Sequence, residues 1–331
     1  MIGSCRPCIS VNINTYARRR FNKLVEKHRS FFSGHHLLHT SASKSAPVQS
    51  QNKSNIEYCV DLVRKSDYEN YLATLLLPKN VQRAAFALRA FNVELAQVRD
   101  VVSDKTIGLM RMQFWKDSMS RIFQGDPPQT PVAVELAGVC GFYKLSKRWM
   151  ERIVEARALQ LNRDSFLSIK EAEEYAEHSN SSLTYLLLEC SGIKNVQADH
   201  AASHLGKAQG LVTLVRAVPY HAARRSVLLP MEILAKHKVS QEDVIRGKDA
   251  QPVKDVIFDI ASVAHQHLEK ARSLRSDLPD KCYTVFLNAA VCDHYLKALQ
   301  QADFNVFDGK LQQRNHLLAY SMFFNKLRKR F

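Results

Sequence analysis

Apolar side chains recur every three or four residues along most of the chain after residue 55. In the clearest stretch these apolar positions are Val81, Ala84, Leu88, Phe91, Leu95, Val98 and Val102. This spacing places them on one face of an α-helix. The same pattern predicts further helices at 107–123, 131–141, 145–161, 169–190, 197–218, 231–237, 252–275, 281–300 and 310–329. No segment alternates with a period of two, so we expect an all-α protein with a single helical domain over residues 56–331.

Local signals indicate where some of these helices begin and how two of them pack. Pro78 stands just before the 81–102 pattern, where proline suits the start of a helix. Ser240 followed by Asp243 predicts a capping box at the start of a short helix. Gly206 and Gly210 lie four residues apart on a predicted helix. We expect them to allow close approach of a neighbouring helix.

The first part of the chain has the composition of a mitochondrial targeting sequence. Residues 1–50 hold eight Arg or Lys and one Glu, and residues 16–25 can form a short basic amphipathic helix. No continuous apolar core of a secretory signal is present. We therefore predict a mitochondrial transit peptide at residues 1–45 and a polar linker at 46–55. A basic tail without a targeting role is the alternative.

Charge and composition narrow the classes of function. The net charge is +15, of which +7 lies in residues 1–50, so +8 remains for the helical part. That excess suits an anionic membrane surface or an acidic partner. Nucleic acid is not expected as a partner, because no arginine-rich motif with interleaved aromatic residues occurs there. No apolar run reaches about 18 residues, so no transmembrane helix is expected.

Three stretches in a fixed order carry a family resemblance. They are residues 67–78, residues 84–91, and the segment that runs from His204 through Arg216 to Pro230. Together they resemble the squalene/phytoene synthase family, and the resemblance covers nearly all of the helical part. It implies an isoprenoid-synthase-like helical bundle.

Within that family, the sequence is most similar to a group of mitochondrial complex I (NADH:ubiquinone oxidoreductase) assembly factors that lack the synthase chemistry. This similarity implies that the partners are complex I subunits or assembly intermediates. It also implies peripheral attachment to the matrix side of the mitochondrial inner membrane.

Synthases of this family hold Mg²⁺ between two facing helices that carry acidic side chains at i and i+4. The ions bind the substrate diphosphate and stabilise its departure. The first motif of the family falls here on residues 96–100. Ala96 and Gln97 replace its leading acids, and only Asp100 remains.

The second motif has also lost its acids. Ala217 replaces its Asp, and Tyr220 and His221 replace its closing Glu–Asp pair. No acid occurs between Asp199 and Glu232, so a small shift of the alignment would not restore the motif. Because Mg²⁺ needs hard oxygen ligands, we expect no metal, no cofactor and no catalysis.

Asp100 and Asp104 form a D-x-x-x-D pattern one turn further along the chain. On a continuous helix this spacing would place both carboxylates on one face. Two carboxylates without a facing partner are too few for a metal site, which favours solvated acids at a helix end. A shifted catalytic motif is the alternative.

A basic group lies in the stretch that is free of acids, and it consists of Lys207, Arg216, Arg224 and Arg225. In the family, the equivalent residues face the diphosphate. The resemblance therefore suggests a residual pocket for an anionic lipid head group or an acidic segment of a partner. The alternative is that these side chains lie over packed surface.

Two further features favour packing over binding. His200 and His204 stand four apart, as zinc ligands can, but no third His, Cys or Glu lies nearby in sequence. His265 and His267 point to different faces of a helix.

The last helix is apolar and ends in the basic residues 326–330. We expect it to pack into the core, and attachment to the inner membrane is the alternative.

The sequence thus predicts a pseudoenzyme that acts as a non-enzymatic complex I assembly factor. The alternative is an isoprenoid- or lipid-binding carrier, or a residual prenyl-diphosphate transferase. An apolar cavity with clustered arginines would favour lipid handling, whereas a collapsed core would favour a purely structural role.

Overall fold

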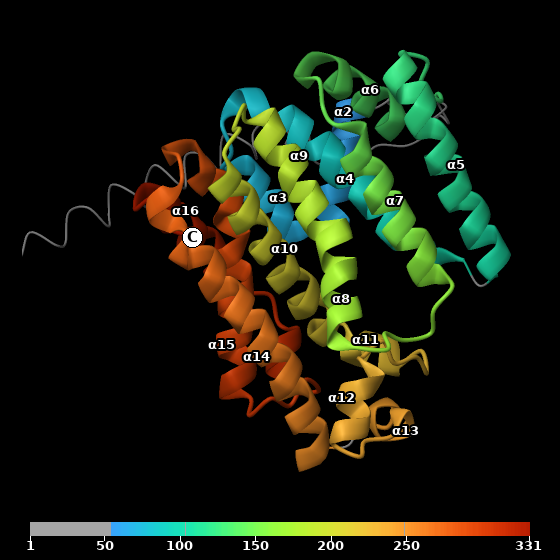
Figure 1. Cartoon of the computed structure of the whole chain (residues 1–331), viewed down its shortest axis with the longest axis vertical. Coiled ribbons are helices and arrows are strands. Elements are labelled where there is room, and N and C mark those ends of the chain that lie inside the picture. The colour runs from blue at the N-terminus through green and yellow to red at the C-terminus, as the bar shows by residue number, and fades with distance from the viewer. Residues whose placement is uncertain (1–53, 103, 248) are drawn as a thin grey trace, which may run out of the picture. The chain divides into compact units, whose positions relative to one another are not determined.

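The computed structural model describes residues 54–102, 104–247 and 249–331, which contain helices and no strands (Figure 1). The predicted all-α fold is confirmed for these residues, which belong to one compact unit. The transit peptide predicted at residues 1–45 lies outside the described residues.

The α-helices are α2 (Asn55–Ser66), α3 (Tyr68–Leu75), α4 (Lys79–Val101), α5 (Lys105–Gln124), α6 (Pro131–Tyr143), α7 (Lys147–Leu161), α8 (Ile169–Ala176), α9 (Ser182–Cys190), α10 (Val196–Arg216), α11 (Val218–Ala222), α12 (Met231–Lys236), α13 (Gln241–Ile245), α14 (Gln251–Ser273), α15 (Ala289–Gln301) and α16 (Leu318–Leu327). The structure also contains a π-helical segment, η1 (Glu177–Ser181). Its 3-10 helices are η2 (Arg275–Asp277), η3 (Asp280–Asn288) and η4 (Gly309–Gln312).

The helix ends follow the local signals in the sequence. Pro78 precedes α4 as its N-cap residue. The predicted capping box is present at α13, where Ser240 and Asp243 satisfy each other's backbone N–H groups. Gly125 ends α5 in the left-handed conformation, with a φ of 82°, which glycine adopts without steric cost.

The core is built around α4 and α10. Helix α4 contacts α2, α3, α6 and α9, and its residues 84–91 are all buried. Helix α10 lies along α14 and also packs against α8, η1 and α15 (Figure 1). Because both helices carry apolar side chains on more than one face, neither has a wide solvent-facing surface.

The close approach expected at Gly206 and Gly210 is confirmed. A Cβ atom on Gly206 would lie 2.2 Å from Ser181 Oγ and 2.5 Å from the Ser181 backbone nitrogen. A Cβ atom on Gly210 would lie 2.3 Å from the Cβ atom of Ala176. Helix α10 therefore presses directly on the junction of α8 and the π-helical turn.

Three predicted helices differ in detail from the structure. The stretch 169–190 is helical, but η1 separates α8 from α9. The stretch 281–300 begins as the 3-10 segment η3 and becomes α-helical at α15. Helix α16 begins only at Leu318, because the Asn315 side chain accepts the backbone N–H of Leu317 at 2.8 Å and turns the chain there.

The C-terminal helix α16 packs into the domain. Leu318 and Met322 are buried in a small cluster with Leu76 of the segment after α3. The Lys326 ammonium donates to the Leu76 carbonyl at 2.7 Å, and Lys329 pairs with Asp280. Within the described ranges, no helix is both long and apolar enough to span a membrane.

Candidate functional site

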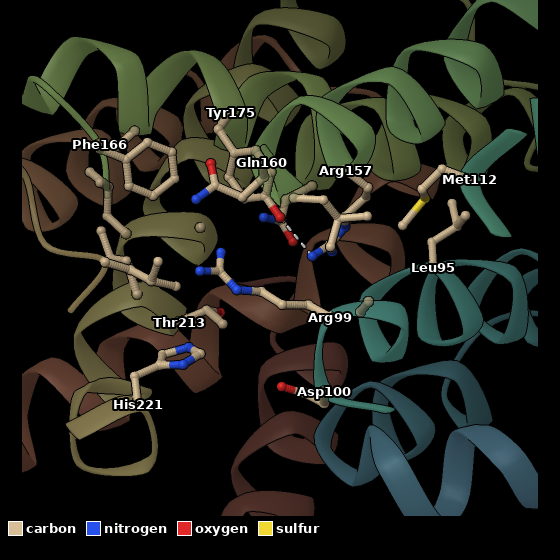
Figure 2. A pocket seen from close by; sticks show the side chains of 18 residues that line it. Leu95, Arg99, Asp100, Met112, Arg157, Gln160, Phe166, Tyr175, Thr213 and His221 are labelled. Carbon is tan, nitrogen blue, oxygen red and sulfur yellow. Dashed lines mark hydrogen bonds between the residues drawn. The ribbon is translucent and has the colours of Figure 1, made fainter. Parts of the chain in front are cut away.

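A cavity of 240 Å³ lies between α4, α7, α8 and α10, with α11 at one side. Much of its wall is apolar and comes from Leu95, Met112, Leu161, Phe166, Leu211 and Leu214. The polar side chains that line it include Arg99, Asp100, Arg157, Gln160, Tyr175 and His221 (Figure 2). The wall thus combines an apolar surface with an excess of hydrogen-bond donors over acceptors.

Arg99 reaches from the last turns of α4 into the middle of this cavity (Figure 2). Burial lowers the pKa of its guanidinium, and the nearby Tyr175, Asp100 and Asp164 only partly oppose that effect. Its Nη1 atom is buried and has no hydrogen-bond partner. The residue as a whole is half-buried, and partial removal of a cation from water is costly unless an anion approaches it.

Arg157 enters the cavity from α7 and is held by neutral groups. It donates to the Tyr175 hydroxyl at 2.7 Å and to Asn92 Oδ1 at 3.2 Å. Its Nε atom is buried without a partner, as is the Nε2 atom of Gln160 one turn further along the helix. Arg157 and Gln160 line the same cavity as Arg99 (Figure 2).

The residues at the first family motif point in different directions. Ala96 and Asp100 line the cavity. Gln97 does not line it, because its side chain donates to Ser66 Oγ at 2.9 Å. The motif therefore contributes one carboxylate, Asp100, which belongs to an exposed residue.

The residues at the second motif contribute a neutral ring to the cavity. His221 lines the wall, and burial together with the charge of Arg99 lowers the pKa of its imidazole. Tyr220 is an exposed residue whose hydroxyl interacts with Asp100. Ala217 is the C-cap residue of α10.

The alternative D-x-x-x-D site is not formed. Helix α4 ends at Val101, and Val102 is extended, with φ of −103° and ψ of 128°. Asp104 instead caps α5, where its carboxylate accepts the Thr106 backbone N–H at 2.7 Å. Asp100 and Asp104 therefore do not share one helix face.

The donor set does not fit the Mg²⁺ ions that the resemblance implies. Mg²⁺ requires several oxygen ligands whose negative charge balances its own. The cavity lining offers one carboxylate, Asp100, beside the cationic Arg99. The described residues also contain no cluster of three or more His, Cys, Asp or Glu side chains that could hold a metal.

The structure does not bring together the four basic residues predicted to form a pocket. Arg216 pairs with Glu69 at 2.6 Å, and Arg225 lies 3.6 Å from Glu242. Arg224 stacks on its neighbour Tyr220, 3.7 Å from the ring centre, and Lys207 lies 4.0 Å from Glu177. None of the four lines the cavity, where Arg99 and Arg157 supply the positive charge instead.

The histidines make a contact that sequence spacing did not predict. His204 Nδ1 lies 2.8 Å from His267 Nδ1, and His267 Nε2 lies 2.6 Å from Glu173 Oε1. Burial and the His267 charge lower the pKa of His204 to about 4. His200 and His265 are exposed and are not part of this contact. The cluster ties α10 to α14 and α8.

Comparison with known families and proteins adds to this geometry. Residues 63–320 match the family model described as squalene/phytoene synthase. The chain is 52% identical over 274 residues to a Rattus norvegicus protein named "NADH dehydrogenase (ubiquinone) complex I, assembly factor 6", covering 83% of this chain and 82% of that protein. A Homo sapiens protein of the same name is 52% identical over 272 residues, with 82% of each chain covered.

The fold is also similar to that of a solved dehydrosqualene synthase in complex with a ligand. The TM-score is 0.71 at 17% sequence identity, and the match covers 83% of this chain and 95% of the other. At this identity the similarity concerns the fold alone.

Proposed function

This chain belongs to the squalene/phytoene synthase family, among relatives named complex I assembly factor 6, and on that premise we propose that it serves the assembly of respiratory complex I without catalysing a reaction. The observation that carries the proposal is the 52% identity to the Rattus norvegicus relative over most of both chains. Identity of this degree across nearly the whole helical unit supports a shared role rather than a shared scaffold.

The chemistry of the cavity supports the non-enzymatic part of the proposal. Departure of a diphosphate needs divalent cations held by several carboxylates. Here Ala96, Gln97 and Ala217 occupy motif positions that the resemblance assigns to acids, and Asp100 is the carboxylate of the lining. Arginines can bind an anion, but the residues present offer no ligand set that would hold the metal.

The proposal includes a place of action at the matrix side of the mitochondrial inner membrane. The acid-poor residues 1–45 and the net charge of +8 beyond residue 50 support import and attachment to an anionic surface. The chain would contact complex I subunits or assembly intermediates there as a peripheral protein.

The test is complementation of cells from which the gene for this chain has been removed. Assembled complex I is measured on native gels after expression of the wild type or of Asp100→Asn. We expect loss of assembled complex I in the deleted cells and equal rescue by both forms. Normal complex I in the deleted cells would contradict the assembly role. Failed rescue by Asp100→Asn, at equal protein level, would contradict the non-enzymatic part.

A lipid-carrier role is a second candidate, because the cavity has not collapsed. It retains 240 Å³, an apolar wall and two arginines, Arg99 and Arg157. A protein that served only as a scaffold would gain stability by filling this space with side chains. Ligand binding and complex I assembly are compatible, since a bound ligand could stabilise the form that engages the partner.

A further inference from the structure

Helix α5 presents a row of apolar side chains to solvent. Ile107, Met110 and Phe114 stand at i, i+3 and i+7 of this helix, a spacing that places them on one face. They are 49%, 67% and 44% exposed. Single exposed apolar side chains are common on protein surfaces, but a row of three on one helix face indicates a contact that the described residues do not supply.

The other side of α5 attaches the helix firmly to the fold. Met112, Trp115 and Met119 are buried, and Trp115 packs edge-on against Phe91 of α4 with ring centres 5.0 Å apart. The helix also packs against α6 and α7, and it lies at the outer edge of the helical unit (Figure 1). The exposed row is therefore held on a rigid support and is not needed to fix the helix.

The charge of α5 accompanies this row. The helix carries four basic residues and one acid, Asp117, which gives it a net charge of +3. Arg111 follows Ile107 by four residues and Arg121 follows Phe114 by seven, so both cations lie beside the apolar row. An apolar row with cations next to it is typical of a helix that lies in the interface of an anionic membrane.

We propose that α5 is the surface by which this protein lies on an anionic lipid bilayer. Ile107, Met110 and Phe114 enter the boundary between head groups and acyl chains, and Arg111 and Arg121 lie at the lipid phosphates. This inference rests on the proposed place of action at the inner membrane and names the part of the chain that makes the contact. The helix lies parallel to the membrane plane and does not cross it.

Other occupants of this face fit less well. In a symmetric pair of copies the same face would meet itself and bring two net charges of +3 together, which is unfavourable. A protein partner would need a shaped pocket to hold three separate side chains, whereas a bilayer deforms around them. The C-terminal helix α16 is a weaker candidate for the membrane contact, because Leu318 and Met322 are buried in the domain.

The test is flotation of the chain from residue 46 onward with lipid vesicles. This form omits the basic leader, which would itself bind anionic lipid, and retains the compact unit formed by residues 53–331. The vesicles contain equal parts of phosphatidylcholine and phosphatidylglycerol, or phosphatidylcholine alone. We expect at least tenfold stronger binding to the anionic vesicles at low salt, and weaker binding as salt is added.

The apolar part of the contact is tested by Ile107→Gln combined with Met110→Gln. We expect this double variant to bind the anionic vesicles at least tenfold more weakly than the wild type, because the apolar area that enters the lipid is lost. The matched control combines Val196→Gln on α10 with Leu317→Gln before α16, which are 68% and 69% exposed. The control should bind as the wild type does.

The charged part is tested by Arg111→Gln combined with Arg121→Gln. We expect weaker binding at low salt and a smaller effect of added salt. Lys194→Gln combined with Lys281→Gln removes the same charge from exposed positions outside α5 and should have the smaller effect. Thermal melts of all the variants should lie close to that of the wild type, since the changed side chains are exposed.

A fluorescent probe locates the contact without loss of any binding residue but one. The described cysteines, Cys59, Cys140, Cys190, Cys282 and Cys292, are all buried. Met110→Cys would therefore be the accessible site of the helical unit for an environment-sensitive dye. We expect a blue shift of the dye emission on addition of anionic vesicles, and no shift for the same dye on Val196→Cys.

Several results would overturn the proposal. These are absent binding to anionic vesicles, equal binding to the neutral vesicles, equal loss in the Val196 and Leu317 control, or an unshifted dye at position 110. A dimer in solution that the Ile107 and Met110 variant abolishes would assign the face to a second copy instead. Because vesicle binding is measured without complex I, the assembly role is decided separately by complementation, and either proposal can fail alone.

Discussion

Helix α4 carries three arginines, and two of them, Arg89 at its middle and Arg99 in its last turn, have different surroundings. Arg89 is 4% exposed, and the negative charge of Asp67 opposes the burial-driven fall in the arginine pKa. Arg99 is half-buried and lines a cavity, where Tyr175, Asp100 and Asp164 oppose the same effect. Asp67 itself accepts two hydrogen bonds from Asn70, at 2.8 Å each. One arginine is thus closed into the core, and the other borders a cavity.

The difference teaches which buried charges belong to the fold. A buried cation that has a carboxylate partner serves the structure, and removal of either member leaves a costly charge behind. A half-buried cation that lines a cavity is retained at a cost to stability, which is typical of binding sites. The region around Arg89 should therefore respond to mutation through stability, and the region around Arg99 through ligand binding.

The largest effect is expected from Arg89→Met. The substitution roughly keeps the volume but removes the cation whose charge favours the ionised form of the Asp67 carboxyl, so we expect a loss of about 3 kcal/mol in the free energy of unfolding. Urea denaturation measures it. Arg121→Met, which breaks an exposed pair with Asp126, should cost less than about 1 kcal/mol. Equal effects of the two variants would show that Arg89 contributes no more to stability than an exposed arginine does.

A smaller loss is expected where α10 meets η1, next to the cavity. Gly206→Ala would place a Cβ atom 2.2 Å from Ser181 Oγ and 2.5 Å from the Ser181 backbone nitrogen. The Ser181 backbone cannot rotate away from the new Cβ atom as a side chain could. We therefore expect destabilisation of about 2 kcal/mol or more. Gly138→Ala on α6 has nothing within 4 Å of its Cβ atom and should be neutral or stabilising. Thermal denaturation of both variants compares them directly.

A pH effect is expected from Glu94, which lies between the two arginines on α4. Burial raises the pKa of its carboxyl to about 7 from an ordinary value of 4.5. Between these values the folded chain keeps a proton that the unfolded chain has released, so this contribution to stability is lost as the pH rises from 4.5 to 7. Its size should be about 1–3 kcal/mol.

The variant Glu94→Gln isolates that contribution. Its free energy of unfolding should fall less than that of the wild type between pH 5 and about 7.5. Glu155→Gln, which changes an exposed residue on α7, is the matched control and should follow the wild type. If the free energy of unfolding changes with pH equally in the wild type and Glu94→Gln, the Glu94 carboxyl is not desolvated as described.

The sequence predicted the fold well because helix periodicity and caps are local properties. The α4 stripe, the capping box at Ser240 and the close approach at Gly206 are all encoded within a few residues. The π-helical turn at η1 was not predicted, because the apolar spacing over residues 169–190 is compatible with a continuous α-helix. The sequence favoured solvated acids at Asp100 and Asp104, which are exposed, and the alternative of a shifted motif is not formed because helix α4 ends at Val101.

The candidate site was only partly predictable. The motif positions Ala96, Asp100 and His221 do line the cavity. Arg99 stands inside the first motif, but its burial could not be read from its neighbours. Arg157 lies on an amphipathic helix, where an inward arginine has the same sequence signal as an outward one. Contacts across the fold, such as Arg157 with Asn92, decide which residues become buried without a counter-ion.

The central claim, that this family member works without prenyl-transfer chemistry, is tested most directly by incubation of the purified full chain with radiolabelled farnesyl diphosphate and Mg²⁺. We expect product at the level of a sample without protein, both for the wild type and for Asp100→Asn. Turnover well above that level by the wild type, lost in Asp100→Asn, would contradict it and show that the single remaining carboxylate supports catalysis.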